Sequence, residues 1–299
     1  RGGAVVTVTV RAPAKINLVL SVGAARADGF HPLDTIYQAV SLYDDVTVTD
    51  ADAWSVEAAS DDVDLAGVPL DDRNIALRAG RLLASHHDID RAAHLHIAKG
   101  IPVAGGMAGG SADAAATLVA LDRLWSLDTT DDDLLALAAE LGSDVPFALL
   151  GGTARGTGRG EVVTPLADDS SLWWVVVLDD TGLSTPEVYA EFDAAPGIGS
   201  GRPSPDWADL DYLGIIASLR NDLQDPALRM RPDLVTTRET IAEAGADAVL
   251  LSGSGPTFLG LVRDRDAAHD VVERLAERDV LAVRIATGPV AGAHVVEYV

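Results

Sequence analysis

The sequence predicts an α+β fold built from two units. Strand-like and helix-like segments are mixed along the 299 residues, without the strict alternation that a doubly wound parallel sheet requires. The pattern changes near residues 160–170, after the glycine-rich stretch GGTARGTGRGE (151–161). We therefore expect one unit over residues 1–165 and a second over 166–299. A chain of this length that is 48% hydrophobic can form a sizeable core.

The first unit begins with strands. Val6, Val8 and Val10 alternate with threonines, which is typical of a half-buried strand. Further strands are predicted over residues 15–22 and around Val46. A helical pattern follows over 74–87, and an alternating segment, predicted to be a strand, covers 94–99.

A loop of small residues, PVAGGMAGGS (102–111), then leads into a helix that is expected to end near Trp125. The next helix covers 131–142, because acidic residues occupy its first turn and a glycine ends it. The segment SDVPFALLGG follows directly, and Pro146 suits the start of another helical turn.

The second unit opens with a buried strand over 172–180 and a helix that starts at Pro186. The segment 195–206 has the composition of a loop. The remaining predicted elements are two or three helices within 205–245, a strand–turn–strand over 248–262, a helix near 266–278 and two short final strands.

The composition excludes several classes of function. The net charge of −24 is opposite to the basic footprint of nucleic-acid-binding proteins. The sequence contains no cysteine, which excludes disulfides, thiolate metal sites and cysteine nucleophiles and is typical of the cytoplasm. No apolar run is long enough to span a membrane, and the N-terminal segment lacks the pattern of a signal peptide. We expect a cytoplasmic protein with small-molecule partners, as a monomer or a weak dimer.

Only two of the 22 basic residues are lysines, Lys15 and Lys99. A composition that uses arginine almost everywhere suggests that a remaining lysine is needed for its compact, flexible ammonium. Chance survival on the surface is the alternative for each of them.

The glycine loop before the helix at 109–125 suits an anion. Unpaired backbone N–H groups and the helix dipole meet at a helix N-terminus, and glycines let phosphate oxygens approach the backbone. Ser111 could cap this helix or contact a phosphate or its metal ion. The loop is neither a Walker P-loop nor a convincing dinucleotide fingerprint, because no lysine follows its glycines and the glycine spacing differs.

Several motifs together resemble those of the GHMP kinase superfamily. PVAGGMAGGSADAAA is similar to its phosphate-binding motif, and LLSGSGPTFLGLV is similar to its third, C-terminal motif. APAKINLVL with RADGFH resembles the N-terminal motif of one branch, the 4-diphosphocytidyl-2-C-methyl-D-erythritol kinases, and LGSDVPF, TPEVY and RNDL agree with that branch. These matches occur in the expected order from about residue 8 to residue 262.

The resemblance implies a fold and an activity. The fold is a ribosomal-S5-like N-terminal domain and a ferredoxin-like C-terminal domain with the active site between them. The activity is transfer of the γ-phosphate of ATP, with Mg²⁺, to the 2-hydroxyl of the cytidine-diphosphate substrate. The products would be the 2-phosphate and ADP, in the non-mevalonate route to isoprenoid precursors.

The resemblance also assigns residues. Asp144 would accept or orient the hydroxyl proton and Lys15 would stabilise the developing charge, although the sequence by itself makes Asp144 a helix cap. Asn17, Phe30, His31, Thr185 and Tyr189 would bind the substrate, although Phe30 and Tyr189 read by themselves as core residues. Asn74 and Lys99 would lie near the nucleotide. The metal ligands are unassigned apart from Ser111 as one candidate. The phosphate loop would comprise Pro102, Val103, Ala104, Gly105, Gly106, Met107, Ala108, Gly109, Gly110, Ser111 and Ala112.

One residue departs from the family pattern, because Ala108 stands where these kinases usually have glycine. An alanine there is strained if the position needs a positive φ. Two other functions stay open. Another small-alcohol GHMP kinase, such as a homoserine or mevalonate kinase, would give no reason for RADGFH. A nucleotide-binding regulatory protein without turnover would give no reason for Lys15 and Asp144.

Overall fold

The computed structural model describes residues 6–179, 181–195, 202–278, 280 and 282–299. Part of the loop expected over 195–206 lies outside these residues, as does most of the N-terminal segment judged for a signal peptide. None of the helices in the described part of the chain is long and apolar enough to cross a membrane.

An eight-stranded sheet dominates the first half of the described chain, with a central path in the order β12-β1-β2-β4-β3. Residues 7–22 form a single strand with a bulge between Pro13 and Ala14, so the two separate strands predicted there were wrong. Strands β5 and β6 continue the sheet from β2, and the short β8 pairs with β1. Their bounds are β1 Thr7–Val22, β2 Leu33–Ala51, β3 Ser55–Ala59, β4 Ala92–Ala98, β5 Thr153–Thr157, β6 Val162–Leu166, β8 Arg220–Asn221 and β12 His294–Tyr298.

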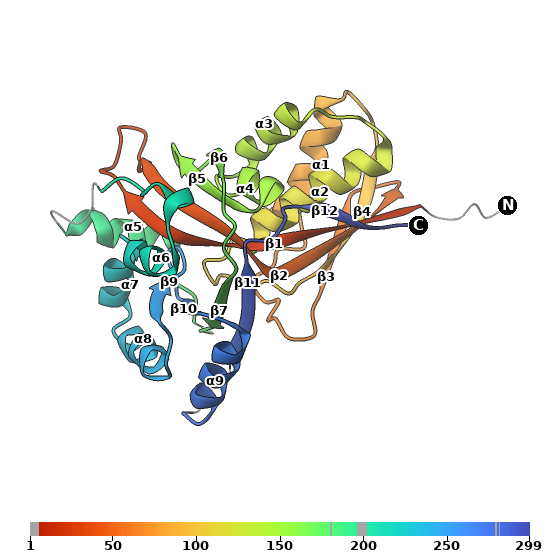
Figure 1. The fold of residues 1–299 in the computed structure, drawn as a ribbon. Coiled ribbons are helices and arrows are strands. Elements are labelled where there is room, and N and C mark those ends of the chain that lie inside the picture. Colours follow the sequence, from red (N-terminus) through yellow and green to blue (C-terminus); the bar gives the residue numbers. More distant parts are fainter. Residues whose placement is uncertain (1–5, 180, 196–201, 279, 281) are drawn as a thin grey trace.

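Four helices of the first half lie together in Figure 1, and α2 is the central one. Almost every residue of α2 between Ala112 and Leu121 is buried, because the alanines let α1, α4 and the sheet approach closely. The bounds are α1 Ile75–His86, α2 Gly109–Trp125, α3 Asp131–Leu141 and α4 Val145–Leu150. These helices match the predicted segments, including the end of α2 at Trp125.

The second half forms a four-stranded antiparallel sheet in the order β11-β7-β10-β9. In chain order this is fourth, first, third, second, and the helices between the strands give the ferredoxin-like arrangement that the resemblance implied. The bounds are β7 Leu172–Val177, β9 Ala248–Leu251, β10 Phe258–Val262, β11 Val283–Gly288, α5 Thr185–Ala194, α6 Tyr212–Ser218, α7 Gln224–Met230, α8 Asp233–Glu243, α9 Arg265–Ala276 and a 3₁₀ turn at Trp207–Asp209.

Strand β7 joins the two halves. Leu172, Trp174 and Val176 pack into the core of the first half, whereas Val175 and Val177 pack against the helices of the second. The last strand, β12, also returns to pair with β1 (Figure 1). The division at residues 165 and 166 stays a prediction, since elements from beyond it complete the first sheet.

Candidate active site

A cleft of about 680 Å³ brings together residues that are far apart in the sequence. Lys15 and Asn17 of β1 face it with Asp144, which lies between α3 and α4. Gly106 and Ala108 of the glycine loop also line it. The substrate residues predicted from the sequence line the same cleft, namely Phe30, His31, Thr185 and Tyr189.

Lys15 is held by a fixed set of contacts. Its ammonium donates to Asn17 Oδ1 at 3.0 Å and lies 3.3 Å from Asp144 Oδ2 and 5.1 Å from the centre of the Tyr37 ring. The Asn17 amide in turn donates to Thr35 Oγ1 at 2.8 Å, which keeps its oxygen toward the lysine. Because only 8% of the Lys15 side chain is exposed, its charge acts in a site largely shielded from water.

Asp144 is not a helix cap. It stands at the N-terminal boundary of α4 with φ −90° and ψ −10°, and its side chain makes no capping hydrogen bond. The carboxylate turns instead toward Lys15 and keeps 31% of its side chain exposed in the cleft. The capping role expected of its side chain from sequence alone was therefore wrong, and the carboxylate pairs with Lys15 in the cleft.

Two tyrosines near Asp144 stay protonated. Burial, followed by the charge of Asp144, raises the pKa of Tyr37 well above its ordinary value. The same two causes raise the pKa of Tyr189 to about 12. Both phenols therefore remain hydrogen-bond donors at neutral pH. Sequence reasoning missed Tyr37, although the strand register places it directly opposite Asn17.

The glycine loop has the strained backbone that Ala108 suggested. Ala108 adopts φ 59° and ψ 35° at the N-cap of α2, and Ala104 (φ 55°) and Gly106 (φ 71°) also have positive φ. The turn at 252–257 braces the loop, since Ser252 Oγ donates to the carbonyl of Gly106 at 3.0 Å. A Cβ on Gly106 would lie 2.3 Å from the Ser252 carbonyl oxygen, which explains the glycine there.

Helix α2 begins at Gly109 without any side-chain cap, so its first N–H groups are open to a ligand. Ser111 lies in the first turn and does not cap the helix, which corrects that expectation. Met107 and Ala112 belong to the core, and Gly105 is buried beside Thr257. The remaining predicted loop residues line either this cleft or a smaller neighbouring pocket, apart from Ser111.

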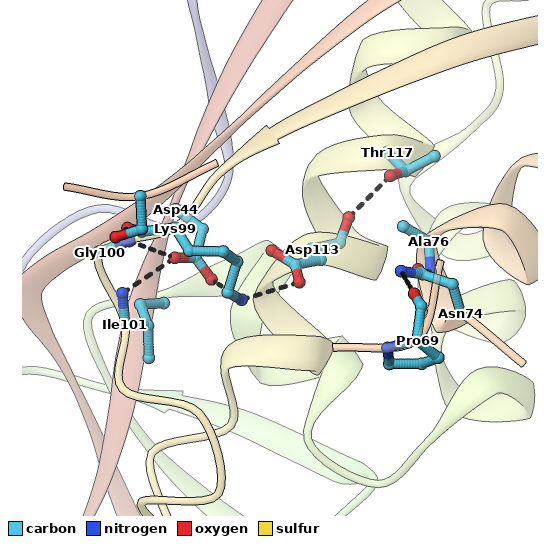
Figure 2. Close-up of polar contacts among 10 residues, drawn as sticks. Asp44, Pro69, Asn74, Ala76, Lys99, Gly100, Ile101, Asp113 and Thr117 are labelled. Carbon is cyan, nitrogen blue, oxygen red and sulfur yellow. Dashed lines mark hydrogen bonds and ion pairs between the residues drawn. The ribbon is translucent and has the colours of Figure 1, made fainter. Parts of the chain in front are cut away.

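The smaller pocket, of about 210 Å³, is lined by Asn74, Lys99, Pro102, Val103, Ala104, Gly109 and Gly110, among others. Asn74 caps α1 by accepting from the Ala76 N–H at 2.8 Å and donates to the Pro69 carbonyl at 2.7 Å (Figure 2). Both predicted nucleotide residues, Asn74 and Lys99, thus lie beside the glycine loop, and both also have structural hydrogen bonds.

Lys99 is buried between two carboxylates. Its ammonium lies 2.5 Å from Asp44 Oδ2 and 2.8 Å from Asp113 Oδ2 (Figure 2). Burial acts to lower the pKa of Lys99, but the two carboxylates outweigh it and raise the pKa, so the lysine stays charged. The alternative of chance survival on the surface is wrong for this lysine, and also for the buried Lys15.

Aromatic rings that line the same cleft are suited to a planar ligand. Phe30 is 49% exposed, so reading it as a core residue was wrong. His31 Nε2 lies 2.8 Å from Asp193 Oδ1, and its ring centre is 4.9 Å from that of Tyr189. Tyr189 does pack against the second core while its ring faces the cleft. Asp193 was missed, since its 162-residue separation from His31 leaves no local signal.

Comparison with known proteins agrees with this arrangement. Residues 74–152 match the N-terminal domain of the GHMP kinases and residues 208–280 match their C-terminal domain. A protein of Nocardioides sp., named 4-diphosphocytidyl-2-C-methyl-D-erythritol kinase, is 58% identical over 296 residues, covering 97% of this chain and all of the relative. The chain belongs to this family of GHMP kinases.

Solved structures support the same fold. A crystal structure of 4-(cytidine 5'-diphospho)-2C-methyl-D-erythritol kinase is 33% identical, with a TM-score of 0.78 over 93% of this chain and 98% of that one. The homoserine kinase of Cytophaga hutchinsonii reaches a TM-score of 0.73 at 18% identity, over 99% of both chains. Because this second GHMP kinase differs in sequence, its likeness shows the fold only, and the substrate has to be argued from the cleft.

Proposed function

We propose that this kinase transfers the γ-phosphate of ATP to the 2-hydroxyl of 4-diphosphocytidyl-2-C-methyl-D-erythritol. The observation that supports it is the cleft itself, which is lined both by the Lys15–Asp144 pair and by Phe30, His31 and Tyr189. An alcohol would meet the carboxylate and lysine while a pyrimidine meets the rings. The products would be the 2-phosphate and ADP, in the synthesis of isoprenoid precursors.

The chemistry follows from the pair. Asp144 orients the 2-hydroxyl and takes its proton as the hydroxyl oxygen forms a bond to the γ-phosphorus. The bond from that phosphorus to the bridging oxygen breaks, and ADP leaves with the electron pair. Lys15, fixed by Asn17, pairs with Asp144 and stabilises the negative charge around the transferred group.

The glycine loop would hold the triphosphate. Its positive-φ residues present backbone N–H groups, and the uncapped start of α2 adds its dipole. Asn74 and Lys99 line the adjoining pocket, where the nucleotide would lie. In the described part of the chain no group of three or more histidines and acidic residues could hold a metal ion. A Mg²⁺ ion would be held mainly by the triphosphate and water, with the Ser111 hydroxyl as the protein's candidate contact.

A cytoplasmic location and a monomer or weak dimer remain part of this proposal, supported by the cysteine-free, acidic composition. The test of the activity is ADP release measured with ATP and one alcohol at a time. The cytidyl substrate should support release, whereas homoserine and mevalonate should not. ATP binding without release for any of them would favour a regulatory protein.

A further inference from the structure

A tight turn between β5 and β6 presents Arg159 to the cleft. The flanking residues Gly158 and Gly160 have φ 73° and 106°, conformations that side-chain-bearing residues rarely adopt. A Cβ on Gly160 would lie 2.2 Å from the Tyr37 hydroxyl, and one on Gly158 would lie 2.8 Å from the Glu161 carboxylate. The positive φ values therefore favour glycine on both sides of Arg159, and the contact with Tyr37 adds a steric requirement at Gly160.

The turn is attached to the strand that supports the reactive end. The Leu33 N–H donates to the Gly158 carbonyl at 2.8 Å, and the Tyr37 hydroxyl donates to the Gly160 carbonyl at 3.4 Å. Tyr37 is also the ring beneath Lys15. Arg159 itself lies over the Phe30 ring, with 4.8 Å between its guanidinium carbon and the ring centre. The turn thus contacts both Tyr37, which lies beneath Lys15, and Phe30.

The cleft has few charges to offer an anionic ligand. Among its described lining residues, Lys15 is paired with Asp144 at 3.3 Å and His31 with Asp193 at 2.8 Å. Arg159 has only a looser ion pair, with its Nε 3.7 Å from Glu161 Oε1, and 36% of its side chain is exposed. Because the chain has a net charge of −24, an anion bound in this cleft needs a cation close to it.

We propose that Arg159 binds the diphosphate of the substrate. This proposal rests on the proposed function, in which the diphosphate links the pyrimidine, packed against the aromatic rings, to the alcohol at Asp144. A guanidinium can donate two parallel hydrogen bonds to phosphate oxygens, and its flat face already rests on Phe30. The position of an arginine between two glycines in GTGRGE was the sequence signal that was missed.

The test compares binding of CDP and cytidine by calorimetry, in the intact protein and in Arg159→Gln. The intact protein should bind CDP more tightly than cytidine. The variant should lose about tenfold or more in CDP affinity, the scale of a hydrogen bond to a charged group, with a much smaller change for cytidine. In turnover, KM for the cytidyl substrate should rise while kcat and KM for ATP stay near their original values.

Arg26→Gln is the matched control, since Arg26 lies near Phe30 in the chain, is paired with Asp28 and does not line the cleft. It should leave CDP affinity unchanged. Equal losses of CDP and cytidine in Arg159→Gln would assign the arginine to the pyrimidine and overturn the proposal, as would unchanged binding of both. Failure of the intact protein to bind CDP at all would instead overturn the proposed function.

Discussion

The buried cluster of Asp44, Lys99 and Asp113 gives a sharp prediction, because the same change from aspartate to asparagine should have very different effects on stability at its two carboxylates. Asp44 accepts from Lys99 through Oδ2 and from the backbone N–H groups of Gly100 and Ile101 through Oδ1, at 2.8 and 2.9 Å (Figure 2). Asp113 accepts only from Lys99, and its Oδ1 is buried without a partner.

Asp44→Asn should strongly destabilise the fold. It removes one of the two charges that balance Lys99 and also disturbs two backbone hydrogen bonds at the start of the glycine loop, which Asp113 does not make. The expected cost is about 3–5 kcal/mol, as for a broken buried ion pair. Asp113→Asn leaves the pair of Asp44 and Lys99 intact. It loses one charge-assisted hydrogen bond but relieves an unpartnered carboxylate, so the net change should stay within about 1 kcal/mol at pH 7.

The pH dependence of stability should also distinguish Asp113→Asn from Asp44→Asn. Burial and the charge of Asp44 raise the pKa of Asp113 well above its ordinary value, against the opposing effect of Lys99. A carboxyl whose pKa is raised by folding contributes stability below its unfolded pKa and loses that contribution as pH rises through the folded pKa. Asp113→Asn removes this loss, so the variant should gain stability relative to the original protein as the pH is raised.

The measurement is urea unfolding followed by circular dichroism at several pH values, with free energies from linear extrapolation. Asp45→Asn is the control, because this neighbouring carboxylate has a partly exposed ion pair with Arg11, worth at most about 1 kcal/mol. Similar costs for Asp44→Asn and Asp113→Asn would refute the reasoning, as would parallel pH profiles for Asp113→Asn and the original protein.

Three further predictions concern the active site. Lys15→Arg keeps the charge but should lower turnover about 100-fold, roughly 3 kcal/mol, because a guanidinium would pair bidentately with Asp144. Steady-state kinetics should show this loss with only a small change in ATP affinity, and near-normal turnover would contradict the prediction. Ala108→Gly should stabilise the fold by up to about 1 kcal/mol, because glycine adopts the left-handed backbone of this position without strain. Ala116→Gly, inside α2, should destabilise it by about 1 kcal/mol or more. If urea unfolding gave changes in free energy of the same sign for both variants, Ala108 would not be strained. Gly110→Ala meets only Ile75 at 3.5 Å, so it should fold normally yet weaken ADP binding in calorimetry, and unchanged affinity would place the phosphates elsewhere.

Most of the fold could be read from local patterns, because helices such as α1 and α3 have their own caps, periodicity and ends. The long strand β1 was divided in two, since a bulge at Pro13 interrupts its alternation without ending its pairing. The return of β12 to β1 had no sequence signal, because pairing across nearly the whole chain depends on tertiary packing.

The site also has features that follow from local sequence and features that depend on tertiary packing. Lys15 and Asn17 lie two residues apart on one face of a predicted strand, so their contact follows from strand spacing. The departure of Ala108 from the family's glycine marked the position to examine, but whether its φ is positive could be answered only by the structure. The burial of Lys99 could not be foreseen, because its partners Asp44 and Asp113 come from β2 and α2.

The central claim is that the cleft phosphorylates the 2-hydroxyl of the cytidyl substrate with Asp144 as the proton acceptor. The most direct measurement follows the reaction of ATP and 4-diphosphocytidyl-2-C-methyl-D-erythritol by ³¹P NMR, with the original protein and Asp144→Asn side by side. We predict a new phosphomonoester on the 2-hydroxyl with equal ADP, formed at least about 100-fold more slowly by the variant at near-normal ATP affinity. A phosphomonoester at another hydroxyl, no phosphomonoester at all, or equal rates for the two proteins would contradict the claim.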